Sequence, residues 1–399
     1  MNRSAASLPW LNRTVIGIGL ASLFSDWSHE TATTLLPAFL ATMGGAAAWL
    51  GLIEGVSDGL SSFAKLTSGY FTDRLPRRKP VAVVGYLVTA IGTASFGLAT
   101  ASWHVLLARA SAWLGRGVRT PVRKALLAGA VTAETYGRAF GFERMMDTIG
   151  AIIGPATAVA LLAAMHGNYP RLFALTLVPG LVAAALIALV VQERDRRPVP
   201  HLSPTGSWRA LPADFKRFLV AVAVFGCGDF AHTLLILFAA QRLSPSLGSA
   251  RAAAIATSLY LLHNTLYAGF AFVGGWLADR CPKRPLLAAG YALAALMSTV
   301  LLALPASVGS LFLVFSLGGI YVALEETLED SICAELVSPD QHGMAFGCLA
   351  TVNGIGDLAS SVVVGALWTA FGTGPAFVYS AVLSLLGAGL MLLKRLRWR

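Results

Sequence analysis

Residues 69–80 read GYFTDRLPRRKP, a short basic segment between two apolar runs. A second copy at residues 275–285 reads GWLADRCPKRP, displaced by 275 − 69 = 206 positions. Both copies share the pattern G-x-x-x-D-R-x-P followed by two basic residues. Because the displacement is about half of the 399-residue chain, the repeat predicts a duplicated membrane domain with the same loop in each half.

The composition is that of a membrane protein. Of the residues 56% are hydrophobic and only 13% are charged, and the mean hydropathy is +0.68. A soluble domain carries about 25% charged residues. Spans of about 20 apolar residues joined by short loops leave room for roughly twelve helices. We expect these spans at 13–41, 47–71, 80–99, 103–127, 138–164, 169–191, 215–241, 252–277, 285–304, 307–330, 343–369 and 374–393.

The basic residues predict the topology. Most Lys and Arg residues lie in clusters at the two termini and in alternate loops. The clusters are Arg3 and Arg13, residues 74–79, 116–138, 194–217 and 280–284, and Lys394, Arg395, Arg397 and Arg399. The intervening loops carry few, and cytoplasmic loops are the ones enriched in Lys and Arg. We therefore expect a multi-pass protein of a cell membrane, the bacterial inner membrane, with both termini cytoplasmic. The same alternation argues against nucleic acid as the partner of a chain with net charge +10.

The middle of the chain is polar, charged and rich in proline. Residues 192–212 read QERDRRPVPHLSPTGSWRALP, and such a composition is typical of a loop. We therefore predict an N-terminal six-helix bundle at 1–191, a cytoplasmic linker at 192–214 and a C-terminal six-helix bundle at 215–399.

The repeated loop resembles that of the major facilitator superfamily, in which G-x-x-x-D-R-x-G-R-R joins the second and third helices and a weaker copy joins the eighth and ninth. Pro76 and Pro282 stand where the family usually has Gly. The resemblance implies an all-α fold of twelve transmembrane helices in two pseudo-symmetric bundles, a small-molecule substrate, a lipid bilayer as surroundings and a monomeric state. It implies a conformational-switch loop made of Gly69, Asp73, Arg74, Arg77, Arg78, Gly275, Asp279 and Arg280.

The resemblance also implies a role for the two loop carboxylates. Asp73 is expected to cap the N-terminus of a neighbouring helix, the eleventh, and to pair with nearby arginines. These contacts would stabilise the outward-open state. Asp279 would do the same, more weakly, in the second half.

Polar residues near the middle of the predicted spans indicate a substrate site. At the 206-residue offset Asp58 matches Asn264, and Asp147 matches Asn353. Two repeats of this kind place a binding site near the midplane between them. The substrate-cavity candidates are Trp27, His29, Asp147, Asp229, His232, Tyr260, His263, Asn264, Asn353 and Asp357.

The first, second and fourth spans contain ionisable residues. Because each such residue costs free energy in a bilayer, their presence indicates a functional or structural role. Glu54 and Asp58 are four residues apart on one helix face, and their mutual repulsion favours keeping one of them protonated. Proton-driven exporters of the family often carry a functional arginine in the fourth helix, followed by glycines. Arg109 resembles it, although the glycines follow at a longer spacing here, and the resemblance implies that Arg109 lies beside Asp26 or Glu54. The proton-coupling candidates are Asp26, Glu30, Glu54, Asp58 and Arg109. Static inter-helix contacts, or a salt bridge to Lys65 or to an arginine of the fourth span, are the structural alternatives.

Opposite charges at the inner ends of the fourth and tenth spans predict a cytoplasmic gate. At the same offset the pairs would be Arg119 with Glu325, Arg123 with Glu329, and Lys124 with Asp330. We expect these ends to approach each other when the cytoplasmic side is closed. The alternative is that each cluster meets solvent and lipid headgroups.

The sequence favours secondary active transport, because it contains no Gly-rich nucleotide loop that would bind ATP. Gly150, Gly154 and Pro155 resemble a G-x-x-x-G-P element in the fifth helix of family antiporters. Our first hypothesis is therefore proton-coupled export of a small organic molecule, a drug or a metabolite. We expect no enzyme activity, since no nucleophile–base arrangement is evident, and no cofactor other than protons as the coupling ion.

Two alternatives stay open. His29 and His232 each follow an aspartate at a spacing of three, and Asp and His side chains suit a transition metal. Ferroportin-like members of the superfamily use such residues in the first and seventh helices. The first alternative is therefore transport of a metal ion or chelate, and the second is a non-transporting membrane sensor.

Overall fold

The computed structural model describes residues 9–44, 47–194, 203–305 and 307–393, and these contain fourteen α-helices, three short 3-10 turns and no strand. Arg3, residues 195–202 of the predicted linker and the basic residues after 393 lie outside the described residues. The helices of the first half are α1 (Arg13–Thr42), α2 (Ala47–Thr72), α3 (Lys79–Ala94), α4 (Ser102–Ala130), α5 (Tyr136–Ala164) and α6 (Tyr169–Leu189). Those that follow are α7 (Pro204–Ala210), α8 (Ala213–Gly226), α9 (His232–Leu247), α10 (Ser249–Ala278), α11 (Lys283–Ala303), α12 (Val308–Leu336), α13 (His342–Phe371) and α14 (Thr373–Leu392).

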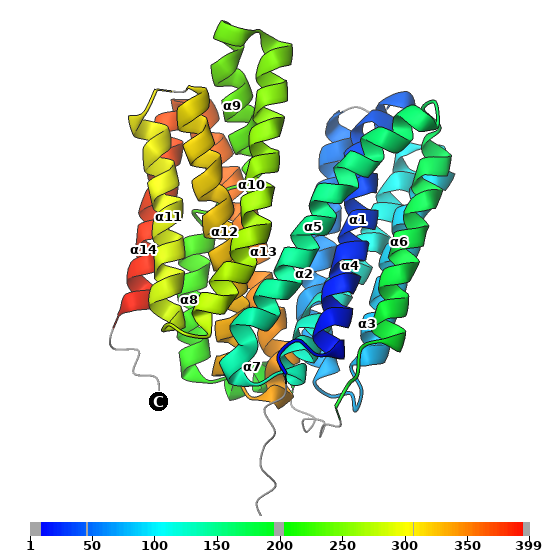
Figure 1. Ribbon diagram of the computed structural model, residues 1–399, viewed down its shortest axis with the longest axis vertical. Coiled ribbons are helices and arrows are strands. Elements are labelled where there is room, and N and C mark those ends of the chain that lie inside the picture. The colour runs from blue at the N-terminus through cyan, green and yellow to red at the C-terminus, as the bar shows by residue number, and fades with distance from the viewer. Residues whose placement is uncertain (1–8, 45–46, 195–202, 306, 394–399) are drawn as a thin grey trace, which may run out of the picture.

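The helices form two bundles, α1–α6 and α8–α14, with the short α7 between them in the chain (Figure 1). The prediction of an all-α protein with twelve spans is confirmed, with α8 and α9 together forming the seventh. Within the described residues, seven helices are long and apolar enough to cross a membrane by length and composition alone. The others are short or carry charged and polar residues, as α4 does at Arg109 and Arg116 and α10 does at His263 and Asn264. The predicted boundaries at 191 and 215 stay predictions.

The prediction of one continuous span over 215–241 is wrong. The helix stops at Gly226 and restarts at His232, so Asp229 and Phe230 lie in irregular, non-helical backbone. Two glycines, Gly226 and Gly228, weaken the helix at this point. Backbone freed inside a bilayer must find partners within the protein, and two serines of α13 supply them: Ser360 donates to the carbonyl oxygen of Asp229, and Ser361 accepts from the N–H of Ala231.

The two bundles meet at one end of the molecule, which we call the linker end because α7 lies there (Figure 1). The helix pairs α2–α13 and α5–α10 carry most of this contact. A Cβ on Gly69 would overlap the carbonyl oxygen of Gly343, and a Cβ on Gly275 would overlap that of Gly137. Small residues of this kind allow helix backbones to touch.

The contact between α2 and α13 ends before the opposite end, which we call the far end. Gly51, Gly55 and Gly59 of α2 have no atom within 4 Å of a Cβ position. Leu358 and Val362 of α13 are 67% and 62% exposed. The bundles therefore diverge from the linker end towards the far end, as Figure 1 shows.

Two carboxylates fasten the linker end, each capping a helix of the other half. Asp73 accepts from the N–H of Gly343 at 2.9 Å and of Met344 at 2.7 Å, at the start of α13, and pairs with Arg78. Asp279 accepts from the N–H of Gly137 at 2.8 Å and from Arg138, at the start of α5. A carboxylate at a helix N-terminus contributes up to about 2 kcal/mol when partly buried.

The burial of Asp73 has a consequence for its charge. Removal from water raises the pKa of this carboxyl, against the opposing effects of Arg78 and the two N–H donors. The charged form that accepts these bonds is therefore lost at a higher pH than in an exposed aspartate.

The remaining loop residues lie outside this contact. Arg74 and Arg280 stack over Tyr70 and Trp276, with guanidinium carbons 3.4 Å and 3.7 Å from the ring centres, and Arg77 is exposed. The role of the loop as a conformational switch stays a prediction.

We predict that Gly69→Ala opens the linker end. The added methyl group has no room against Gly343, and overpacking costs typically about 1–3 kcal/mol. The reporter is Cys348 on α13, which is 6% exposed, in a chain whose other three cysteines are replaced. Its reaction with a maleimide should be about tenfold faster, the ratio that corresponds to roughly 1.4 kcal/mol.

Gly59→Ala is the matched control, because it lies in the same helix with free space around its Cβ. It should leave the maleimide rate unchanged. Equal rates in the two variants would contradict the assigned contact.

Candidate functional site

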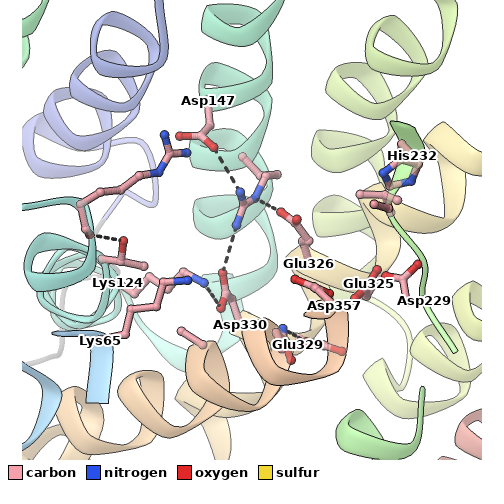
Figure 2. A pocket seen from close by; sticks show the side chains of 18 of the residues that line it. Lys65, Lys124, Asp147, Asp229, His232, Glu325, Glu326, Glu329, Asp330 and Asp357 are labelled. Carbon is pink, nitrogen blue, oxygen red and sulfur yellow. Dashed lines mark hydrogen bonds and ion pairs between the residues drawn. The ribbon is translucent and has the colours of Figure 1, made fainter. Parts of the chain in front are cut away.

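A cavity of about 460 Å³ lies between the two bundles, and charged side chains from both line it (Figure 2). From the first half it receives a basic wall, which we define as Lys65, Arg116, Arg123, Lys124 and Arg144. From the second half it receives an acidic wall, which we define as Asp229, Glu325, Glu326, Glu329, Asp330 and Asp357. The two halves thus present opposite charge to the same space.

Helical spacing produces both walls. On α4 the residues at 116, 120, 123 and 124 lie on one face, and on α12 those at 322, 325, 326, 329 and 330 do. Asp229 reaches the cavity from the break between α8 and α9, and Asp357 from α13. Each wall is therefore built mainly from one long helix and completed by its neighbours.

Two basic residues cross the interface between the halves. Lys124 Nζ lies 2.6 Å from Asp330 Oδ1, and Arg144 Nε lies 2.7 Å from Glu326 Oε2. Arg144 also approaches Asp330, with 3.9 Å between Nη2 and Oδ2. These pairs join α4 and α5 to α12.

The other two gate pairs predicted from the 206-residue offset, Arg119 with Glu325 and Arg123 with Glu329, are wrong for this structure. Arg123 pairs within its own half, 2.9 Å from Glu143 and 3.4 Å from Asp147. Arg119 lies 4.0 Å from Asp26 and stacks over Tyr86. The offset of 206 residues relates positions within the two bundles, but side chains on equivalent faces need not point at each other.

The carboxyls of the acidic wall find neutral donors in their own half. Tyr321 donates to Asp229 at 2.8 Å, and Tyr291 and Asn353 donate to Glu329 at 2.6 Å and 2.7 Å. Within the described part of the chain, four of these carboxyls have no basic side chain within 4.0 Å: Asp229, Glu325, Glu329 and Asp357.

Glu54 and Asp58, two of the proton-coupling candidates, lie outside the cavity lining and contact α4. Arg109 Nη2 lies 2.9 Å from both oxygens of Glu54, and Nη1 donates to Thr33. The Arg109 guanidinium also lies 3.7 Å over the Trp113 ring, whose N–H donates to Asp58 at 2.7 Å.

The two candidates of α1 also lie outside the cavity lining. Asp26 accepts from Arg116 at 3.3 Å, and Glu30 lies 3.8 Å from the buried His29. In this conformation Asp26 and Glu54 are thus each held by an arginine of α4.

Six of the ten substrate-cavity candidates line the cavity: Asp147, Asp229, His232, Tyr260, Asn353 and Asp357. The other four do not. Trp27 donates to Thr157, His29 packs against Trp113, and His263 packs against His232 and Tyr260, whereas Asn264 lies outside the lining.

The two histidines proposed as metal ligands contact residues of their own halves. His29 lies 3.3 Å from Thr33, and His232 lies 3.3 Å from the hydroxyl of Tyr321. Across the described residues, no group of three or more His, Cys, Asp and Glu side chains is arranged to hold a metal ion.

The sequence reasoning did not assign Lys65, Arg116, Arg144 and Glu326 to the site, yet all four line the cavity. Each is an ionisable residue inside a predicted span, which was the available signal. Arg144 and Glu326 have Ala350 and Thr120 at the symmetric positions, so the repeat could not identify them.

Comparisons with known proteins agree with this architecture. An uncharacterised MFS-type transporter of Methanocaldococcus jannaschii is 28% identical over 384 residues, which cover 96% of this chain and 95% of the relative. Multidrug resistance protein MdtH of Photorhabdus laumondii is 35% identical over 109 residues, or 27% of each chain. The fold is similar to that of the transporter FucP in its outward conformation, with a TM-score of 0.78 and 16% identity over 97% of this chain and 99% of FucP.

The family itself is identified by its sequence model. The model of the Major Facilitator Superfamily matches residues 16–241 and again residues 218–397, so that each half of the chain is covered. The chain belongs to the Major Facilitator Superfamily, and it is a multi-pass membrane transporter rather than an enzyme.

Proposed function

We propose that this transporter is a proton-coupled exporter of a small organic molecule that works by alternating access. The observation that carries the proposal is the cavity between two bundles that touch at one end only. If the linker end faces the cytoplasm, as the distribution of basic residues favours, this conformation is outward-open. We propose the bacterial inner membrane as its location, cytoplasmic termini and a monomeric state.

The contacts at the linker end suit a gate. They include two carboxylate caps, of which Asp279 also forms an ion pair with Arg138, and the ion pairs Lys124–Asp330 and Arg144–Glu326. All of these contacts cross the interface between the halves, so all of them must break when the linker end opens.

Glu54 and Arg109 are the proposed site of proton coupling. The Arg109 side chain is 3% exposed, whereas that of Glu54 is 37% exposed and accessible to protons. Protonation of Glu54 would leave the buried guanidinium of Arg109 without its charged partner. Because Glu54 is partly exposed to solvent, the cost lies between the roughly 1 kcal/mol of an exposed pair and the roughly 3–5 kcal/mol of a buried one. Arg109 is on α4, which also carries Arg116 and Lys124. Loss of the Glu54 contact would therefore destabilise the present position of α4 and with it the contacts of Arg116 and Lys124. Asp26, held by Arg116, is the second candidate on the same helix.

Export rather than uptake is supported by two features. The partial similarity to a protein named for multidrug resistance covers 27% of the chain. Gly150 and Gly154 pack closely on α1, where a Cβ would overlap the Leu23 carbonyl oxygen or meet Glu30 Cβ at 2.6 Å. This close packing of α5 accompanies the G-x-x-x-G-P element that resembles antiporters.

We predict that Asp330→Asn opens the linker end and that Glu325→Gln does not. Asp330 loses its pair with Lys124, whereas Glu325 has no ion pair across the interface in the described residues. The Cys348 maleimide rate should rise at least about tenfold in Asp330→Asn, given the cost of a broken buried pair.

The charge exchange Lys124→Asp with Asp330→Lys should restore the slow rate. A fast rate in the exchanged variant, or an equal effect of Glu325→Gln, would count against the gate.

We predict that Glu54→Gln uncouples protons from substrate. Purified protein in liposomes with an internal pH dye is challenged with small organic cations, anions, zwitterions and divalent metals. The wild type should move protons in response to an organic compound. Glu54→Gln should abolish this proton movement and retain exchange of labelled substrate across the membrane, because the neutral amide cannot carry the proton.

Glu54→Asp and the exposed Glu134→Gln are the controls and should keep coupling. Proton movement that survives in Glu54→Gln and is lost in Asp26→Asn would transfer the role to Asp26. A response to metals alone would favour the metal alternative, and a chain that moves no compound would favour the sensor.

A further inference from the structure

The basic wall of the cavity contains two groups that the protein leaves without a full set of partners. Lys65 forms no hydrogen bond or ion pair within the described part of the chain, although its position lines the cavity. Arg116 donates one long bond to Asp26, and its Nη1 is buried with no partner. A buried donor without a partner is costly, so this wall can accept an anionic group.

The acidic wall shows the complementary deficit. Asp357 has no basic side chain within 4.0 Å among the described residues, and the neighbouring Asn353 has its amide oxygen buried with no partner. Asp229 also lines this wall, and its side-chain hydrogen-bond partners, Tyr321 and Glu325, carry no positive charge. These oxygens form a place for a group that donates hydrogen bonds and carries positive charge.

Among the described residues, no ion pair within 4.0 Å joins Lys65 or Arg116 to Asp357 or Asp229, although the charges of Lys65 and Asp357 attract each other across the cavity. Figure 2 shows Lys65 on one side of the cavity and Asp229 and Glu325 on the other. Lys124 and Arg144, by contrast, already pair across the interface. A ligand that bridges the remaining gap must therefore be anionic at one end and cationic at the other.

We propose that the substrate is a small zwitterion, whose anionic group is bound by Lys65 and Arg116 and whose ammonium group is bound by Asp357 and Asp229. This inference rests on the proposed transport function and names its substrate class. A cavity of about 460 Å³ has room for a small molecule. An apolar drug is disfavoured, because it would leave Lys65, Arg116 Nη1 and Asp357 without charged partners in this cavity.

A zwitterion would also give the halves a reason to close around it. Charged hydrogen bonds formed to both walls at once are available only when the walls approach each other. Because a ligand shifts an equilibrium by its differential affinity, such a substrate would favour the state in which the far end is closed.

The test uses purified full-length protein and three ω-amino acids of increasing length: β-alanine, γ-aminobutyrate and ε-aminocaproate. Each is compared with the alkylamine and the carboxylate of the same chain length. Binding is measured as the shift in Tm over a concentration series. We expect at least one amino acid to bind about tenfold more tightly than both of its singly charged analogues.

Two variants assign the ends of the ligand. Lys65→Gln should remove the advantage of the amino acid over the amine, and Asp357→Asn should remove its advantage over the carboxylate. Arg217→Gln and Glu134→Gln remove one positive and one negative charge, respectively, at exposed positions outside the cavity and should leave both ratios unchanged. Ratios that stay at the wild-type value in the two cavity variants would overturn the assignment.

Other outcomes decide the substrate class. An amine that binds as tightly as its amino acid at every length would indicate a cation carrier, and an equally tight carboxylate an anion carrier; either result overturns the proposal. Binding by none of the amino acids would overturn it too. Zwitterion binding without proton movement in liposomes would leave this inference standing and remove proton coupling instead.

Discussion

The exchange of helix caps between the two halves is the interaction on which the conformation depends. Asp73 caps the N-terminus of α13 and Asp279 caps the N-terminus of α5, so each half supplies the cap for a helix of the other half. The glycines at 69, 137, 275 and 343 bring the backbones close enough for these short bonds. Each cap is worth at most about 2 kcal/mol, which is strong enough to define a closed end and weak enough to be broken in a transport cycle.

The repeated loop made the fold predictable, because a motif that recurs after 206 residues fixes two bundles and the placement of their loops. It could not reveal the break in the seventh span. The apolar run continues through it, and only Gly226, Gly228 and Asp229 signal a weak point. The partners that stabilise the break are serines of α13, remote in sequence, so local propensity does not contain them.

The site was predictable in kind and much less so in detail. Ionisable residues inside spans indicated a polar cavity, and six of the ten candidates line it. The offset of 206 residues gave one correct pair across the interface, Lys124 with Asp330, and failed for Arg123, which pairs with Glu143 on α5 instead of Glu329. Residue types and spacing give the face of a helix, whereas partners depend on how neighbouring helices are rotated.

Two helices, one in each half, connect the proposed gate to the cavity. On α4 the charged residues Arg109, Arg116 and Lys124 contact Glu54, Asp26 and Asp330, so its position depends on a proton-accessible acid, the cavity and the gate. α13 carries three such features in succession: its N-terminus capped by Asp73, Asp357 in the cavity, and Ser360, which donates to the backbone of Asp229 in the break between α8 and α9. The residues of one helix are joined by its backbone, so a shift of α4 or α13 changes contacts at all of these levels together. Alternation between the two ends then needs no separate relay, because the residues that would bind substrate and proton share a backbone with those that close the linker end.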